Sequence, residues 1–155
     1  SSAASDVYKR QVHMMTVKEF LNDVRRQHAR VEACEERLKE IECEVISLKS
    51  PQLGDKIQSN SVKSLDEVIC RLELKRAETS REFVRLMDMQ DKAETLISCE
   101  KDHDRWAVLY RRYILNQKWK KIAVEINLDL RWIYRLHGQG LRDLENTPLK
   151  ATINL

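Results

Sequence analysis

Apolar residues recur every three or four positions along most of this chain, and this period predicts helices rather than strands. In the first such stretch two apolar sets alternate, each repeating every seven residues. The sets are Val17, Val24, Val31, Leu38 and Val45, and Phe20, Cys34, Ile41 and Leu48, with Gln27 as the one polar break. This heptad pattern predicts a coiled-coil-like helix roughly 50 Å long. The helix is expected to begin at a capping box, Thr16 to Glu19, and to end at Ser50-Pro51.

A second apolar stripe follows the polar stretch from Pro51 to Ser64 and begins at another capping box, Ser64 to Glu67. It reaches about Cys99 and comprises Leu65, Val68, Leu72, Thr79, Phe83, Leu86, Ala93 and Ile97. Two helices of similar length joined by a polar loop are expected to fold back as an antiparallel hairpin. Because the apolar seam of each helix is narrow, a lone two-helix hairpin leaves part of the seam exposed to solvent. We therefore expect the arm to form a homodimer or to dock on a partner; the alternative is packing on its own C-terminal domain.

The last third of the chain has the spacing of a helix-turn-helix. Ala123, Asn127 and Ile133 lie four and then six residues apart. A small residue lets the second helix cross close to the first, a left-handed former makes the turn, and a branched residue seats the second helix in the core. Asn is the best left-handed former after Gly. Asp129 stands where it can cap the second helix.

The second helix of the motif is predicted to run from about Leu130 to Leu144, with two different faces. The apolar face comprises Ile133, Leu136, Gly140 and Leu144. The opposite face comprises Arg131, Arg135, Gly138 and Arg142, with Tyr134 beside them. A helix from Asp104 to about Leu115, capped within Asp102-His103-Asp104, would complete a three-helix unit by presenting Val108, Leu109 and Tyr113.

Charge separates the chain into the same two parts. Residues 105–142 hold nine Lys or Arg and two acidic residues, a net +7, whereas residues 1–100 hold 17 basic and 19 acidic residues, a net −2. A basic domain on a weakly acidic arm points to double-stranded DNA as the partner. We predict that Arg131, Tyr134 and Arg135 contact base edges in the major groove. We predict phosphate contacts from Lys118, Lys120, Lys121 and Arg142.

The remaining chemistry excludes several classes of function. Cys34, Cys43, Cys70 and Cys99 have no metal-ligand spacing, and Cys99 with His103 forms half a zinc site without a second pair. No phosphate loop, nucleophile elbow or acid–base constellation is present. No apolar run approaches the length of a membrane span. We expect no catalytic site, no metal, no cofactor and no membrane, and we place the protein in the cytoplasm.

These patterns divide the chain into four segments. Residues 1–13 resemble translated adapter sequence, so the native protein is expected to start at Met14 or Met15. Residues 14–101 form the hairpin arm, 102–145 the helix-turn-helix domain, and 146–155, which contain Pro148, a tail. The predicted fold is all-α.

The C-terminal domain resembles a known family over roughly residues 104–145. The likeness lies in Trp119-Lys-Lys-Ile-Ala, in Asn127-Leu-Asp-Leu-Arg-Trp-Ile-Tyr-Arg-Leu-His137, in the preceding Arg112-Tyr113-Ile114, and in Leu141 and Leu144. These residues look like region 4 of sigma-70-type factors. They look more closely like small phage and prophage proteins that join a helical arm to such a domain, in the neighbourhood of the ArpU- and RinA-type late-gene regulators. The resemblance implies DNA binding near promoters in a bacterial host, and it leaves contact with RNA polymerase open.

The sequence thus favours a phage-type transcriptional regulator that is not an enzyme. Two alternatives remain open. One is a DNA-recognition component of phage packaging, similar to a small terminase subunit. The other is a helical adaptor that binds a host protein without DNA.

Overall fold

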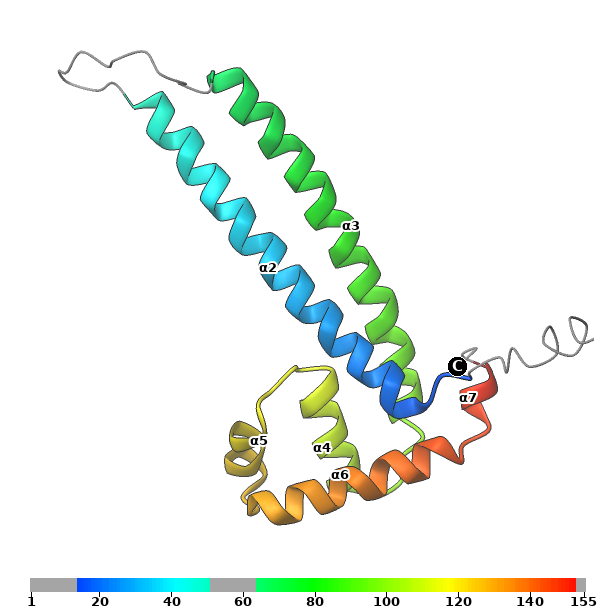
Figure 1. The fold of residues 1–155 in the computed structure, drawn as a ribbon. Helices are drawn as coiled ribbons and strands as arrows, with labels where there is room; N and C mark the ends of the chain where they lie inside the picture. The colour runs from blue at the N-terminus through cyan, green and yellow to red at the C-terminus, as the bar shows by residue number, and fades with distance from the viewer. Residues whose placement is uncertain (1–13, 51–63, 153–155) are drawn as a thin grey trace, which may run out of the picture. The chain divides into compact units, whose positions relative to one another are not determined.

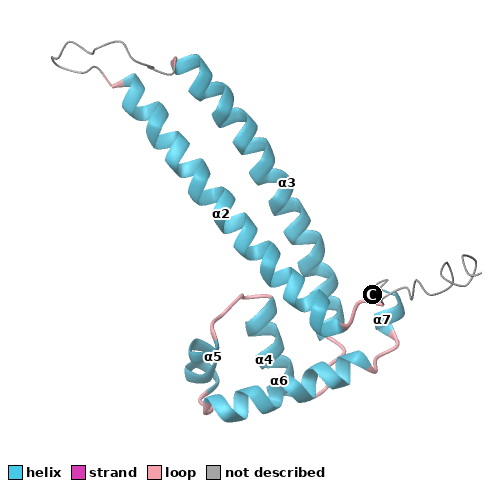
Figure 2. Cartoon of the chain, in the orientation of Figure 1, coloured by secondary structure: helices cyan, strands magenta, loops and turns pink. Residues whose placement is uncertain are grey.

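The computed structural model describes residues 14–50 and 64–152, and these residues contain helices and no strand (Figure 2). The helices are α2 (Val17–Lys49), α3 (Leu65–Ile97), α4 (His103–Tyr113), α5 (Trp119–Ile126), α6 (Leu130–Glu145) and α7 (Leu149–Thr152) (Figure 1). The predicted all-α fold, a long hairpin followed by a small helical domain, is confirmed. The predicted leader and most of the predicted polar loop lie outside the described residues.

By packing, the chain forms two compact units. One is Arg26–Met89, and the other combines Ser1–Arg25 with Gln90–Leu155. The boundary predicted at residue 102 coincides with the N-cap of α4. Packing nevertheless groups the first turns of α2 and the last turns of α3 with the C-terminal helices. The predicted bounds of the helix-turn-helix domain, residues 102–145, therefore stay a prediction.

In the unit Arg26–Met89, α2 and α3 pack against each other in opposite directions. Their buried cluster joins Ile41 and Val45 of α2 to Val68 and Leu72 of α3. Ion pairs bridge the helices beside this cluster, Arg71 with Glu44 at 2.7 Å and Arg76 with Glu42 at 3.2 Å. Later residues of α3 therefore face earlier residues of α2, as an antiparallel hairpin requires.

The polar break in the heptad pattern is buried and fully engaged. Gln27 is 5% exposed, and its Nε2 donates to the backbone oxygen of Glu82 at 2.9 Å and to the Glu82 carboxylate at 2.7 Å. Arg30 pairs with the same carboxylate at 3.2 Å. The hydrogen bond from Gln27 and the charges of Arg30 and Arg85 outweigh desolvation and lower the pKa of Glu82. The seam thus exchanges an apolar contact for a satisfied hydrogen-bonded pair.

The prediction for one residue of the α3 stripe, Phe83, is wrong. Most of the predicted stripe is buried, but Phe83 is 48% exposed. One set of buried seam positions repeats every seven residues: Leu72, Thr79, Leu86 and Ala93. Between Thr79 and Leu86 the other seam position is occupied by Glu82, the residue before Phe83, which hydrogen-bonds with Gln27. Phe83 is therefore rotated out of the seam. At the end of α2 the predicted seam residue Leu48 is also 39% exposed.

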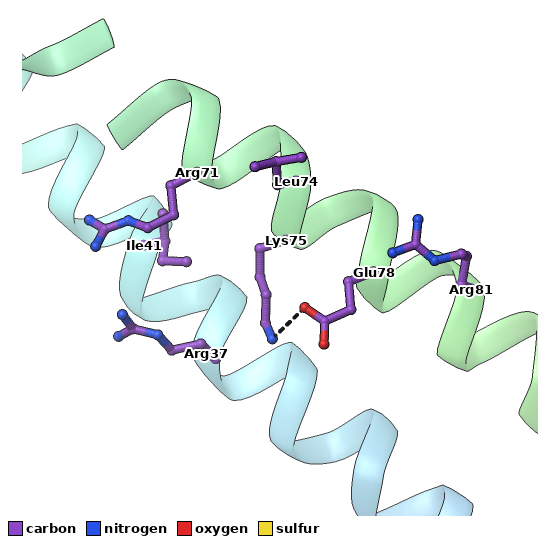
Figure 3. Close-up of a pocket in the computed structure, with 7 residues that line it drawn as sticks. All are labelled: Arg37, Ile41, Arg71, Leu74, Lys75, Glu78 and Arg81. Carbon is purple, nitrogen blue, oxygen red and sulfur yellow. Dashed lines mark hydrogen bonds and ion pairs between the residues drawn. The ribbon is translucent and has the colours of Figure 1, made fainter. Parts of the chain in front are cut away.

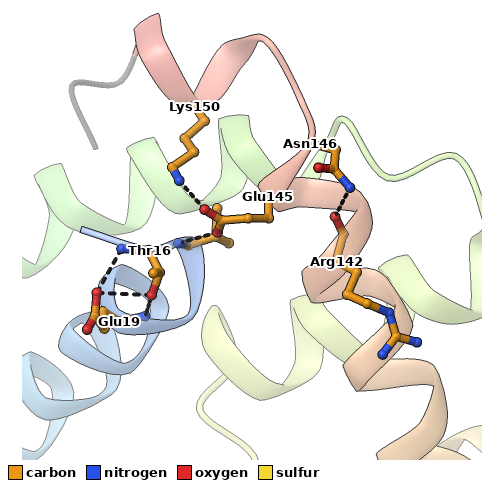
Figure 4. Close-up of polar contacts among 7 residues, drawn as sticks. Thr16, Glu19, Arg142, Glu145, Asn146 and Lys150 are labelled. Atoms are coloured by element: carbon orange, nitrogen blue, oxygen red, sulfur yellow. Dashed lines mark hydrogen bonds and ion pairs between the residues drawn. The ribbon is translucent and has the colours of Figure 1, made fainter. Parts of the chain in front are cut away.

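In the other unit, the start of α2 is held by the end of α6. The predicted capping box is formed, because Thr16 N–H donates to the Glu19 carboxylate at 2.8 Å and Glu19 N–H donates to Thr16 Oγ1 at 3.2 Å (Figure 4). The next amide, Val17 N–H, donates to Glu145 Oε2 at 2.8 Å, and Lys150 pairs with the other oxygen of Glu145. Burial alone would raise the pKa of Glu145, but these two hydrogen bonds outweigh it and lower the pKa. The predicted tail therefore contains a short helix, α7, that reaches back to α6.

Candidate nucleic-acid interface

Helices α4, α5 and α6 pack on one another around a small core. Val108 of α4, Ile122 of α5, and Ile133 and Leu136 of α6 form its buried cluster. Ala123, the small residue of the predicted motif, is partly buried against it. The apolar face predicted for α6 is buried at all four positions, and Val108, Leu109 and Tyr113 of α4 are buried as predicted.

The turn between α5 and α6 has the geometry that the spacing predicts. Asn127 ends α5 in the left-handed conformation, with φ 58° and ψ 45°. Its N–H reaches the carbonyls of Ala123 and Val124, and Leu128 N–H donates to Ala123 O at 3.0 Å. Asp129 then caps α6, its Oδ1 accepting from Trp132 N–H at 2.8 Å. The end of α5 and the start of α6 are thus both capped within a three-residue connection, Asn127 to Asp129.

Gly140 sets the distance between α4 and α6. A Cβ at this position would lie 2.8 Å from Leu109 Cδ1 and 3.3 Å from Leu109 Cγ. Such a contact is closer than packed carbon atoms allow, so a side chain at position 140 would have to displace Leu109 at the crossing of the two helices. At Gly138, two residues before Gly140, an added Cβ would have no atom within 4 Å. The helix therefore contains one glycine that packing requires and one that it does not.

The face of α6 opposite the core is exposed and basic. Arg131 and Arg135 are exposed, Tyr134 is 50% exposed and Trp132 is 42% exposed. The Arg135 guanidinium lies over the Trp132 ring, 5.2 Å from its centroid. Within residues 14–50 and 64–150, neither Arg131 nor Arg142 has an ion-pair partner. The side chains predicted for base contact thus remain available to a ligand.

The lysines before and within α5 differ in how free they are. Lys118 is the N-cap residue of α5 and makes no side-chain capping bond, and Lys120 is exposed. Neither forms an ion pair in the part of the chain that the structure describes. Lys121 lies 3.8 Å from Glu125, which also pairs with Arg111. Lys118 and Lys120 are therefore the stronger phosphate candidates of the three.

An aromatic cluster that the sequence did not reveal adjoins this face. The Trp119 ring carries the Arg112 guanidinium 4.1 Å from its centroid, and it meets the rings of Tyr134 and His137 edge-on at 5.2 and 4.8 Å. His137 Nε2 shares a hydrogen bond of 2.7 Å with the Tyr113 hydroxyl. Tyr134 is therefore anchored on one side by Trp119 while its other side stays open.

Two members of the cluster, the buried Tyr113 and the partly buried His137, are held neutral. Burial raises the pKa of Tyr113 to about 12. Burial, together with the charges of Arg112 and Lys18, lowers the pKa of His137 to about 4. One sequence signal could have found this residue: His137 stands four residues after Ile133 and three before Gly140, on the buried face of α6.

A second basic cluster lies on the arm but is largely neutralised. The cluster lines a groove between α2 and α3 (Figure 3). The residues that line this groove are Arg37, Ile41, Arg71, Leu74, Lys75, Glu78 and Arg81. Arg37 pairs with Glu40, Arg71 with Glu44, and Lys75 with Glu78. Cations that already have carboxylate partners offer little to an anionic ligand. The basic residues of this groove are therefore better explained by ion pairs within and between the arm helices than by binding of an anion.

Residues 14–50 and 64–152 hold no cluster of three or more His, Cys, Asp or Glu side chains that could bind a metal. Their helices include none with the length and hydrophobicity to cross a membrane. All four cysteines are free, with Cys34 buried and Cys43 and Cys70 exposed.

No protein-family model, curated protein or solved structure matches this chain.

Proposed function

We propose that this protein binds double-stranded DNA in a sequence-dependent manner, with the N-terminal half of α6 in the major groove. One observation carries the proposal. A helix-turn-helix whose turn, cap and core are formed at Asn127, Asp129 and Ile133 presents Arg131, Tyr134 and Arg135 on its exposed side. Arginine forms paired hydrogen bonds with guanine, and this is the commonest specific contact in the major groove.

The phosphate contacts in this proposal come from both helices of the motif. Lys118 and Lys120 stand at the start of α5, and Arg142 lies exposed near the end of α6. Backbone contacts at the two ends would fix the depth and direction of α6, while its exposed arginines read bases. The residue between the two lysines, Trp119, packs on Tyr134 and so ties the predicted phosphate side to the predicted base-reading side.

At a finer level we propose a transcriptional regulator of the phage type, not an enzyme, acting in a bacterial cytoplasm. This part rests on the resemblance of residues 104–145 to sigma region 4-like regulators. The arm would then serve self-association or contact with RNA polymerase. We favour self-association, because Phe83, Val84 and Met87 leave apolar surface on α3, at 48, 65 and 49% exposure. Residues three and four apart share a helix face, so these side chains form one patch.

The test of DNA binding starts from a random pool of duplexes. Bound sequences are enriched over several rounds, and the best duplex and a scrambled version are then compared by fluorescence anisotropy over a salt series. We expect tighter binding to the enriched duplex and an affinity that falls steeply with salt. Enrichment of no sequence, with equal weak binding to both duplexes, would reduce the proposal to nonspecific binding. Absence of binding at low salt would end it and favour the adaptor function.

Two alanine variants test the assigned roles. Arg135→Ala should cost about 1–3 kcal/mol on the enriched duplex and relax preference at one base pair. Lys120→Ala should weaken binding to the enriched and scrambled duplexes alike and reduce the salt slope by about 1. Both side chains are exposed, so neither change should alter folding. Equal losses on both duplexes from both variants would contradict the division of roles.

A further inference from the structure

Three cations from outside α5 and α6 surround the aromatic cluster. Lys18 and Arg25 come from the first turns of α2, seven residues apart and therefore on one face of that helix, and Arg112 comes from α4. The charges of Arg112 and Lys18 both lower the pKa of the partly buried His137, and the charges of Arg112 and Arg25 both oppose the rise in the pKa of Tyr113. All of these residues belong to the same compact unit.

The two arginines are positioned by backbone geometry rather than by acidic partners. Arg112 Nη1 donates to the carbonyl of Gln117 at 2.9 Å, and its guanidinium stacks on Trp119. Arg25 Nε donates to Asn116 Oδ1 at 3.1 Å, and Asn116 itself adopts a positive φ of 51°. Through residues 14–50 and 64–150, no carboxylate pairs with either guanidinium.

The fold therefore holds like charges close together without compensation. Burial and the charge of Arg25 lower the pKa of Arg112, so the protein itself disfavours this pair of cations. The opposite arrangement is found on the arm, where several basic side chains, among them Arg71 and Lys75, pair with glutamates. Uncompensated cations that are partly shielded from water favour an anion, and planar guanidinium groups fit phosphate oxygens in pairs.

We propose that Arg25 and Arg112, with Lys18 at the edge, bind a backbone phosphate of the DNA beside the groove that α6 occupies. The site adjoins the predicted base-reading face, because Trp119 contacts Arg112 on one side and Tyr134 on the other. Helix α2 thereby contributes directly to the DNA contact. This inference rests on the proposed function, and it adds α2 and α4 to the interface that the two helices of the motif, α5 and α6, form.

The test compares Arg25→Gln with Arg85→Gln in the full chain. Gln at position 25 can still donate to Asn116, whereas Arg85 is an exposed residue of α3 in the other unit, so both variants lose one charge and only one loses the site. Affinity for the enriched duplex is measured by anisotropy over a salt series. Loss of one phosphate contact should weaken binding roughly eightfold at about 0.1 M salt and reduce the salt slope by about 1. Arg85→Gln should leave both quantities close to those of the wild type.

Thermal unfolding separates a binding role from a structural one. Because Arg25→Gln removes repulsion of Arg112, the midpoint should stay unchanged or rise while DNA affinity falls. Lys18→Gln, at an exposed position, should give a smaller loss of affinity in the same direction and guards against an effect of folding. If wild-type protein binds DNA and Arg25→Gln binds equally well, the inference fails and the proposed function stands. If the wild type does not bind DNA, both fail.

Discussion

At the scale of single residues, the protein keeps a histidine uncharged in the middle of a basic surface. His137 lies between the Tyr113 hydroxyl and the Trp119 ring, and burial with nearby Arg112 and Lys18 lowers its pKa to about 4. A protonated imidazole here would add a fourth cation to three that are already uncompensated. The folded state of this unit therefore favours neutral His137, and protonation of the ring would destabilise it.

The histidine makes stability depend on pH in a defined direction. Its pKa is lower in the folded than in the unfolded chain, so the unfolded state binds more protons on acidification, and stability is lost as the pH falls from about 6.5 towards 4. The loss should approach about 3 kcal/mol at the acidic end, since one pKa unit corresponds to about 1.4 kcal/mol. Urea unfolding at a series of pH values between 4 and 7.5 measures it.

The variant His137→Gln should flatten this dependence, because glutamine does not titrate. His103→Gln, at an exposed position, serves as the matched control and should retain it. A wild-type stability that is unchanged between pH 7 and 4.5 would contradict the neutral, buried histidine.

The exposure of a residue could be predicted wherever it depends only on the residue's position around its own helix. The basic side of α6 and its apolar back follow from a period of 3.6 residues, and Arg131, Arg135, Ile133 and Leu136 lie where that period places them. The cluster of Arg112, Trp119 and His137 was missed because it depends on how three helices cross. No property of one helix specifies such a crossing.

At the scale of elements, helix ends were predicted well because capping is local. Asp102 and Asp129 accept the expected amides at the starts of α4 and α6, and Asn127 takes the left-handed conformation that ends α5. Each of these features needs only neighbours within four residues. The predicted burial of Phe83 was wrong for the opposite reason, because it depends on a contact between two helices. Glu82 occupies the seam position opposite Gln27, and Phe83 therefore faces outward.

The two glycines of α6 give an element-scale prediction with an internal control. Gly138→Ala should stabilise the protein by about 0.5–1 kcal/mol, because alanine favours helix and its Cβ meets nothing within 4 Å. Gly140→Ala should instead destabilise by about 1–3 kcal/mol, because its Cβ would lie 2.8 Å from Leu109 Cδ1 and must displace a fully buried side chain.

Chemical denaturation of both variants measures the difference, and opposite signs are the expected result. Stabilisation by both alanines would mean that α4 and α6 can separate at no cost. In that case Gly140 would not set the helix crossing.

At the scale of the whole molecule, charge is distributed unevenly along the sequence. Residues 105–142 carry a net +7 and residues 1–100 a net −2. The positive segment would draw in a polyanion over the Debye length, about 10 Å at 0.1 M salt. Lys18 and Arg25 belong to the weakly acidic part by sequence, yet they lie in the same compact unit as α6. Net charge along the sequence therefore located the basic domain but did not reveal the contribution of α2.

Self-association through the arm is also tested on the whole molecule. Val84→Glu places a carboxylate in the patch formed with Phe83 and Met87, and it should raise the dimer dissociation constant by about tenfold or more, since burying an unpaired charge is costly. Ala29→Glu adds the same charge at an exposed site on α2 and should leave the dimer intact. Sedimentation equilibrium over a concentration series distinguishes the two, and a wild-type protein that stays monomeric throughout would exclude a dimer formed by this patch.

The pair of Gln27 and Glu82 acts as an alignment pin for the arm. A seam of identical apolar heptads can slide by one repeat at little cost, and a single polar position can remove that freedom. Sliding α3 by seven residues would bring Lys75 or Met89 to Gln27 in place of Glu82, so the amide would lose its carboxylate acceptor and keep only a backbone carbonyl. This polar pair thereby favours a single register of the hairpin. Every side chain on the outer surface of the arm, including the patch at Phe83, then has a fixed position along it.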